Sequence, residues 1–279
     1  MKLYYRRLGK TPGTPLIILH GLYGSSDNWL NIGKALSEYQ TVYILDQRNH
    51  GQSPHSNEHS YDRMRDDLQQ FMEDHNISKA NLMGHSMGGK TALFYALKYP
   101  EKINTLIVVD IGPGSYQSPE ENSPRTINHL SILDALYNLD TSQVKTLRDA
   151  DQQLADHIPY QRVRQFLLKN LKRNEQGHYQ WILNVPVLRN ELSNIMGGVN
   201  IEKTGSSSNS KHQQHPVLFI KGKKSAYIGA KQKEEIYKLY PEAEITEIEN
   251  AGHWVHAEQR ERFMDTVMSF LEKNQENVM

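Results

Sequence analysis

The chain has 279 residues, 37% of them hydrophobic, which is enough for one large core and makes two equal domains an unfavourable prediction. Lys and Arg total 32 and Asp and Glu total 32, so no net charge would attract nucleic acid or an anionic membrane. The absence of cysteine excludes disulfides, thiolate catalysis and cysteine-rich metal sites, and the lack of an apolar leader or a membrane-length apolar run predicts a cytoplasmic protein without a membrane partner.

Short apolar runs of strand length alternate with helical patterns along most of the chain. The strand-like runs lie at 3–8, 15–20, 41–46, 80–84, 104–110, 216–222 and 243–249, and the first of them is expected at a sheet edge. The helical patterns among them lie at 29–38, 61–75, 90–99 and 258–272. This alternation is typical of an α/β fold with a mostly parallel sheet that helices cover on both faces.

The stretch 112–215 departs from this alternation, because it shows helical patterns and no clear strand. A helix is expected to begin at Ser123 and Pro124, a favourable cap followed by proline at the first helical position. Its buried stripe is predicted to consist of Ile127, Leu130, Leu133 and Leu136, and further helices are expected at 144–158, 160–174 and 187–196. We therefore predict a core formed by 1–111 and 216–279, with 112–215 inserted as a helical cap.

Residues 84–88 read GHSMG, between a predicted strand and a predicted helix. Glycine weakens both kinds of element but permits backbone conformations that other residues cannot adopt. A sharp strand-to-helix turn with this pattern is a nucleophile elbow, which exposes a serine hydroxyl at the carboxyl end of its strand. The pattern predicts Ser86 as a nucleophile.

A serine nucleophile needs an imidazole that takes its proton and a carboxylate that orients the imidazole. His253 lies in the glycine-containing loop 251–256, between the last predicted strand and the last predicted helix. The chain order serine, acid, histidine places the base in such a loop. His253 is therefore the predicted base, whereas His256 is predicted to lie at the surface or in packing.

Asp110 is the predicted acid, and elimination favours it. Many serine hydrolases with this chain order carry the acid after the strand that follows the cap, but the stretch 203–233 contains no carboxylate. Asp110 ends a strand predicted to neighbour that of the nucleophile at about 4.8 Å. A buried carboxylate at this edge requires a partner, and His253 is available. Glu234 and Glu235 remain as alternatives, although both lie inside a predicted helix.

The oxyanion of an acyl-transfer reaction needs backbone N–H donors. The residue after the nucleophile, Met87, and a residue in the loop after an early strand normally supply them. The segment HGLYG at 20–24 directly follows such a strand, so Leu22 is the expected second donor. A plain turn is the alternative interpretation of this segment.

The remaining aromatic and polar residues near these motifs are predicted either to line a pocket or to have a structural role. The candidates for lining an acyl pocket, or for filling the core, are Tyr23, Trp181 and Trp254. Structural roles are predicted for His20, for His85, which is expected to point away into packing, and for a clasp formed by Asp46, Arg48 and Ser53. The other histidines are too scattered to predict a metal site, so neither a metal nor a cofactor is expected.

Six segments in chain order carry a resemblance to a known family. They are HGLYG at 20–24, DQRNHGQS at 46–53, GHSMGG at 84–89, VVDIGP at 108–113, GKKSAY at 222–227 and AGHWVH at 251–256. With these segments the chain resembles the YbfF-type esterases of the α/β-hydrolase superfamily over nearly its whole length. The resemblance implies a serine esterase that acts on short acyl esters or thioesters, with its acid at Asp110. The cap is the less similar part and sets substrate choice.

Two other interpretations stay open. A carbon–carbon bond hydrolase or a menaquinone-pathway-type synthase would use the same serine, although its usual acid position after the cap is empty here. A non-catalytic ligand-binding relative would keep the fold, although such proteins usually lack a member of the triad. We favour transfer of an acyl group from a small-molecule ester to water.

Overall fold

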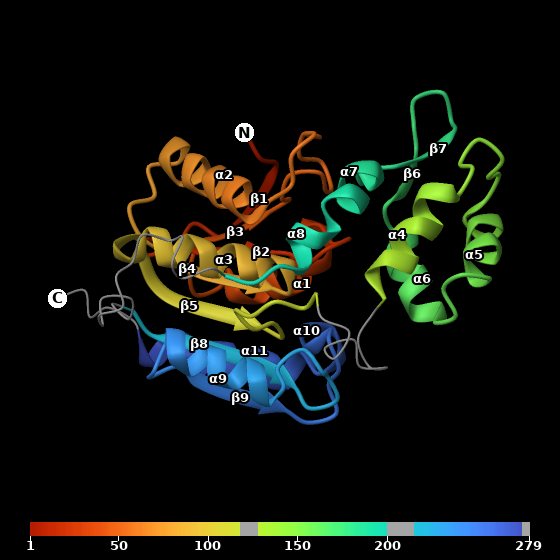
Figure 1. Cartoon of the computed structure of the whole chain (residues 1–279). Helices are drawn as coiled ribbons and strands as arrows, with labels where there is room; N and C mark the ends of the chain where they lie inside the picture. Colours follow the sequence, from red (N-terminus) through yellow and green to blue (C-terminus); the bar gives the residue numbers. More distant parts are fainter. Residues whose placement is uncertain (118–127, 200–214, 275–279) are drawn as a thin grey trace.

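A seven-stranded sheet forms the centre of the molecule in the computed structural model of the chain (Figure 1). The structure describes residues 1–117, 128–199 and 215–274. The strands lie in the order β1-β3-β2-β4-β5-β8-β9. Their bounds are Tyr5–Leu8 for β1, Leu16–Leu19 for β2, Val42–Leu45 for β3, Ala80–His85 for β4, Ile103–Val109 for β5, Val217–Gly222 for β8 and Glu244–Ile248 for β9.

The neighbouring strands of this sheet pair in parallel, except that the edge strand β1 runs antiparallel to β3. Both the α/β fold with a mostly parallel sheet and the edge position of the first strand are thereby confirmed. Parallel strands are buried on both faces and consist of continuous apolar runs. This is the reason why the runs LIIL of β2 and VYIL of β3 are buried throughout.

Helices cover both faces of the sheet. Successive residues of a strand point to opposite faces, so each apolar strand contributes side chains to two separate clusters. Ile17 and Leu19 belong to the apolar cluster that includes α2, α3 and α9, whereas Leu16 and Ile18 belong to the cluster that includes α1 and α11. These helices are α1 (Leu30–Leu36), α2 (Tyr61–Asp74), α3 (Met87–Lys98), α9 (Ala230–Leu239) and α11 (Arg260–Lys273). The short helical turns η1 (Ser26–Trp29), η2 (Pro100–Lys102) and α10 (Val255–Glu258) accompany them.

The described part of residues 112–215, which we call the cap segment, contains short helices and one hairpin. The helices are α4 (His129–Asn138), α5 (Leu147–Ala155), α6 (Gln161–Leu168), α7 (Val185–Asn190) and α8 (Leu192–Met196), and the hairpin strands are β6 (Leu171–Arg173) and β7 (Tyr179–Trp181). The hairpin corrects two expectations, an entirely helical segment and a helix over 160–174. Its turn is formed by Asn174, whose side chain accepts two backbone hydrogen bonds, and by Gly177 at φ 81°. This local turn chemistry overrides the helical pattern.

The helix α4 buries a stripe that differs from the prediction. Its buried residues are Ile132, Leu133, Ala135 and Leu136. Leu130, which we placed in the stripe, is 53% exposed, because it points away from the face that these positions share. The other predicted residues of this helix, Ser123, Pro124 and Ile127, lie outside the described residues.

The cap segment packs on the core through an apolar cluster of its own. The core contributes Leu22, Tyr61 and Met87 to this cluster, and these residues lie near the carboxyl ends of the parallel strands. The cap segment contributes most of the buried residues of α4 to α8. The cap segment therefore covers the edge of the sheet at which the predicted site residues lie (Figure 1). The division into core and cap at 111/112 and 215/216 stays a prediction.

The helices are short. The longest, α2 and α11, have 14 residues each. Across the described ranges, none combines the length and the apolar character that are needed to cross a bilayer.

Candidate active site

Ser86 occupies a strained turn between β4 and α3. Its φ of 53° and ψ of −120° are unusual for a residue with a side chain, and such a conformation costs about 1–3 kcal/mol. The glycines on either side are required by close backbone packing. A Cβ on Gly84 would lie 2.2 Å from the backbone oxygen of Gly88, and a Cβ on Gly88 would lie 2.4 Å from the backbone oxygen of Leu19. The turn therefore has the geometry of a nucleophile elbow.

Asp110 follows β5, the strand next to β4, and its side chain is fully buried. Its backbone has a φ of 51°, which turns the chain sharply at the strand end. The carboxylate accepts a hydrogen bond from the Gly222 amide at 3.0 Å, a short one from the Ser225 hydroxyl, and one from the His253 ring. Three donors therefore hold this buried carboxylate in place.

Ser225 is a contact that sequence reasoning missed. The lack of a carboxylate in 203–233 argues against an acid in the loop after β8, yet Ser225 donates its hydroxyl to Asp110 Oδ2. The motif GKKSAY contained the residue, but no pattern in the sequence indicated its partner. The loop after β8 thus helps to hold the acid instead of supplying it.

His253 lies in the loop after β9, and its ring is held on two sides. Its Nδ1 lies 2.8 Å from Asp110 Oδ2, and its ring stacks on that of Tyr227 with centroids 4.0 Å apart and an interplanar angle of 22°. The backbone carbonyl of His253 accepts a hydrogen bond of 2.9 Å from His85 Nε2. With Nδ1 bonded to the carboxylate, Nε2 is the nitrogen that remains for a nucleophile.

His85 corrects one of our structural expectations. It does not point away from the site, because it lines the same cavity as Ser86 and holds the loop of the predicted base. His85 therefore keeps the predicted structural role, but it performs this role in the wall of the site. His256 is buried in packing and stacks on Trp29 at 4.1 Å, as one of the two predicted alternatives requires.

Histidines also contact the two segments that contain Leu22 and Met87, the residues predicted to hold the oxyanion. His50 Nε2 accepts a hydrogen bond of 3.3 Å from the amide of Tyr23, the residue after Leu22, and His50 Nδ1 lies 2.9 Å from the Arg48 carbonyl. His59 Nε2 lies 3.4 Å from the sulfur of Met87. Leu22 and Met87 line one compartment together with the nucleophile. Both residues therefore lie beside Ser86, and the role of their amides in holding an oxyanion stays a prediction.

Burial lowers the pKa of the histidines that surround the site. The pKa of His85 lies well below its ordinary value, because the ring is buried and next to His253 and His256. Burial and the charge of His253 lower the pKa of His256 to about 3, and burial and the charge of Arg48 lower that of His59 to about 3. The pKa of His50 is also lowered by burial and by neighbouring imidazoles. These rings stay neutral near pH 7, so His253 has no fixed positive neighbours among them.

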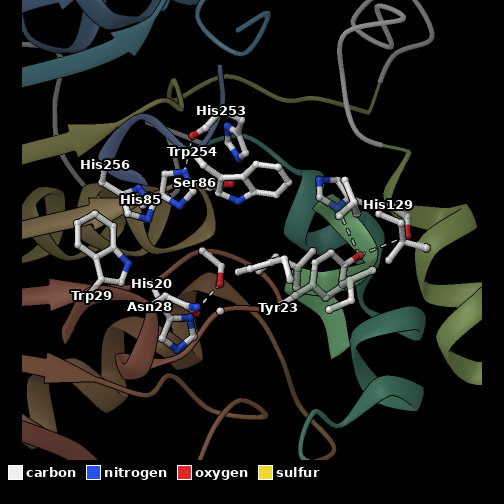
Figure 2. Close-up of a pocket in the computed structure, with 17 residues that line it drawn as sticks. His20, Tyr23, Asn28, Trp29, His85, Ser86, His129, His253, Trp254 and His256 are labelled. Atoms are coloured by element: carbon white, nitrogen blue, oxygen red, sulfur yellow. Dashed lines mark hydrogen bonds between the residues drawn. The ribbon is translucent and has the colours of Figure 1, made fainter. Parts of the chain in front are cut away.

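A narrow cavity with a free volume of about 30 Å³ contains Ser86 and His253 (Figure 2). Tyr23 and Trp254, which we predicted as pocket residues, also line it. Trp181 lies elsewhere among the described residues: its indole nitrogen donates a hydrogen bond of 3.1 Å to the carbonyl of Leu136, inside the cap segment. The structure therefore brings two of the three predicted pocket aromatics to the site.

The predicted polar clasp differs in its partners. Arg48 forms a buried ion pair with Asp67 of α2, at 2.6 Å, instead of with Asp46. Asp46 accepts hydrogen bonds from the amides of Ser26 and Gln52, and the Ser53 hydroxyl donates to its backbone carbonyl. His20 holds the same region, since its Nε2 accepts a hydrogen bond of 2.9 Å from a backbone amide of the loop after β3. These contacts fix the loops behind the site.

No metal centre is evident at the site. Within the part of the chain that the structure describes, no group of three or more His, Cys, Asp or Glu side chains is arranged to hold a metal ion. The buried histidines are engaged with backbone atoms, aromatic rings and one another.

The elbow, the hydrogen-bonded acid and base and the parallel sheet all fit one known fold. A family model described as the alpha/beta hydrolase fold matches residues 14–259. The chain belongs to the α/β-hydrolase family. The resemblance that the six motifs predicted is thereby confirmed.

Named α/β-hydrolases are similar over most of the chain. An sn-1-specific diacylglycerol lipase ABHD11 of Danio rerio is 37% identical and covers 95% of this chain and 80% of its own length. The esterase YbfF of Escherichia coli is 31% identical and covers 92% of this chain and 93% of its own length. A solved marine microorganism esterase superposes with a TM-score of 0.89 at 41% identity, covering 97% of this chain and 99% of its own. The prediction of a carboxylic ester hydrolase is confirmed at the level of enzyme class.

Proposed function

We propose that this α/β-hydrolase cleaves carboxylic esters of short acyl chains, or the corresponding thioesters, through an acyl-enzyme formed on Ser86. The observation that carries the proposal is the 2.8 Å contact between His253 Nδ1 and Asp110 Oδ2, in a cavity that also contains the strained Ser86. A nucleophile, a base and an orienting acid are the three groups that acyl transfer at neutral pH requires.

In the first step Ser86 Oγ attacks the ester carbonyl carbon and His253 Nε2 takes the hydroxyl proton. Asp110 keeps the proton of the neutral ring on Nδ1 and stabilises the imidazolium that forms. The negative charge on the carbonyl oxygen is held by the amides of Leu22 and Met87, each worth about 3 kcal/mol in the transition state. The carbon–oxygen bond to the alcohol then breaks, and His253 gives its proton to the leaving oxygen.

In the second step water replaces the alcohol. His253 takes a proton from the water molecule as its oxygen attacks the acyl carbon, and returns that proton to Ser86 Oγ when the acyl bond breaks. The products are the carboxylic acid, the alcohol and the free enzyme. Atoms and charges balance without a cofactor.

Two observations favour ester cleavage over the carbon–carbon alternatives. The relatives above carry the names of esterases and lipases. The acid stands at Asp110, whereas the position after β8 is occupied by Ser225. The preference for short acyl chains follows from the resemblance of the six motifs to the YbfF-type esterases.

The test is the Ser86→Ala variant with p-nitrophenyl butyrate as substrate. We expect kcat to fall by at least about 1,000-fold, since only binding and oxyanion stabilisation would remain. Labelling by a fluorophosphonate should occur in the wild type and be lost in the variant, while the circular dichroism spectrum is unchanged. A variant that keeps its activity would refute the proposal.

A further inference from the structure

Two compartments meet at Ser86, and they differ in which other reacting groups they contain. The first is the cavity described above, which contains His253 and is closed on one side by the cap helix α6 through Phe166. The second has a free volume of about 20 Å³ and is lined by Met87 and by Leu22, which also lines the first, but its wall does not include His253. Both compartments thus contain Ser86, but only the first contains the predicted base His253.

Acyl transfer assigns the two compartments to different parts of an ester. The leaving oxygen must take a proton from His253, so the alcohol has to lie on the side where that ring is. The carbonyl oxygen points at the amides of Leu22 and Met87, and the acyl chain continues from the carbonyl carbon away from the alcohol. The geometry points to the second compartment as the acyl site and to the first, under α6, as the alcohol site. This assignment rests on the proposed function.

The acyl compartment lies between the core and the chain that returns from α8. Its side walls come from α2 and α3 of the core, with Tyr61 and Lys90, both buried. Ile195 and Met196, at the end of α8, form a further wall, which we call the end wall. Its free volume of about 20 Å³ is the smaller of the two, so we assign to it a short acyl group such as acetyl.

The end wall is fixed by hydrogen bonds from the core and from residue 116. The Tyr61 hydroxyl donates to the Ile195 carbonyl at 2.6 Å, the Tyr116 amide donates to the Met196 carbonyl at 2.8 Å, and Lys90 Nζ donates to the Gly197 carbonyl. Three consecutive carbonyls are thereby held. Because the backbone of the wall is held in this way, only its side chains can determine how long an acyl chain fits.

The alcohol compartment has an apolar wall from the cap segment. Val163, Phe166 and Leu167 of α6 line it, and the Phe166 ring lies 5.5 Å from that of Trp254. Apolar walls favour apolar ligands through the burial of their surface. The substrate class that fits both compartments is a short, linear acyl group esterified to an apolar alcohol or thiol.

Two matched variants separate the compartments. Met196→Ala enlarges the end of the acyl site, and Phe166→Ala enlarges the alcohol site; both side chains are only partly buried, so both variants are expected to fold. Each is assayed with p-nitrophenyl esters from acetate to octanoate and with acetate esters of alcohols from methanol to octanol. Met196→Phe, which fills the acyl site, serves as a second variant at the same position.

For Met196→Ala we expect kcat/KM for hexanoate relative to acetate to rise about tenfold or more, since one methylene in an apolar pocket changes specificity about 10–200-fold. The alcohol series should change less than about twofold. Phe166→Ala should show the reverse, and Met196→Phe should restrict the enzyme to acetate. Exchanged profiles, or acyl profiles unaffected by both Met196 variants, would overturn the assignment. A wild type that hydrolyses none of these esters would instead contradict the proposed function.

Discussion

The carboxyl edge of the sheet and the cap segment position their residues by different means. At the edge, Ser86 and Asp110 stand at the ends of adjacent parallel strands, each in a left-handed backbone conformation that the surrounding structure holds. In the cap segment, helices of 5 to 10 residues are held mainly by apolar packing. The edge therefore fixes reacting atoms, whereas the cap segment shapes the space around them.

This difference teaches where substitutions should affect chemistry and where they should affect fit. A change at a strand end alters a hydrogen bond to a reacting group, so it should act on kcat. A change in the cap segment alters packing or a wall, so it should act on stability or on substrate preference. The predictions below test this contrast.

The largest effect is expected from Asp110→Asn. The amide would present an N–H group to His253 Nδ1, which favours the wrong tautomer of the ring, and kcat should fall by about 1,000–10,000-fold. The matched control in the cap segment is Asp134→Asn, since Asp134 forms an exposed ion pair with Arg189 at 2.6 Å. Steady-state kinetics with p-nitrophenyl butyrate should leave this control within about twofold of the wild type. Equal losses in both variants would remove the contrast.

The second effect concerns stability in acid. Burial holds the pKa of His59, His129 and His256 at about 3 in the folded chain, against about 6.5 in the unfolded chain. Between these values the unfolded chain binds more protons, so the free energy of unfolding falls as the pH falls from about 6.5 toward 3. The slope is at most about 1.4 kcal/mol per pH unit for each histidine.

Urea unfolding at pH 7.5, 6.5 and 5.5 measures this slope. His256→Leu, which replaces one of the buried rings, should reduce the slope by the contribution of one proton. A free energy of unfolding that stays constant from pH 7.5 to 5.5 would show that these rings do not resist protonation.

The smallest effect is expected from Trp181→Phe. The variant loses the hydrogen bond from the indole to the Leu136 carbonyl, worth about 1 kcal/mol of stability, while kcat/KM should stay within about twofold. Trp254→Phe, which alters the wall beside Ser86, should change kcat/KM more than stability. Thermal unfolding and kinetics of the two tryptophan variants sharpen the contrast, and a tenfold loss of kcat/KM in Trp181→Phe would place that residue at the site after all.

The core could be predicted from sequence because its signals are strong and agree with one another. Apolar runs predicted the inner strands, such as LIIL of β2 and VYIL of β3, whereas the edge strands β1 and β9 have mixed sequences. The motif GHSMG predicted the strained turn at Ser86, because backbone contacts leave no room for a side chain at Gly84 or Gly88. The position of Asp110 followed from elimination and from the spacing of parallel strands.

The cap segment and the contacts around the site were harder to predict. The hairpin β6–β7 is specified by a turn at Asn174 and Gly177 within an otherwise helical pattern, and Leu130 fits the period of a stripe that it does not join. Ser225 and the pairing of Arg48 with Asp67 depend on how distant segments meet in space. One-dimensional patterns do not contain that information.

The hydroxyl of Ser225 points at the same carboxylate oxygen as the ring of His253, from the loop that follows the neighbouring strand β8. A carboxylate introduced at 225 would begin beside the imidazole that Asp110 serves now. Such a carboxylate would also lie against that of Asp110, and two like charges repel each other in a buried site, so position 225 suits a neutral donor as long as Asp110 is present.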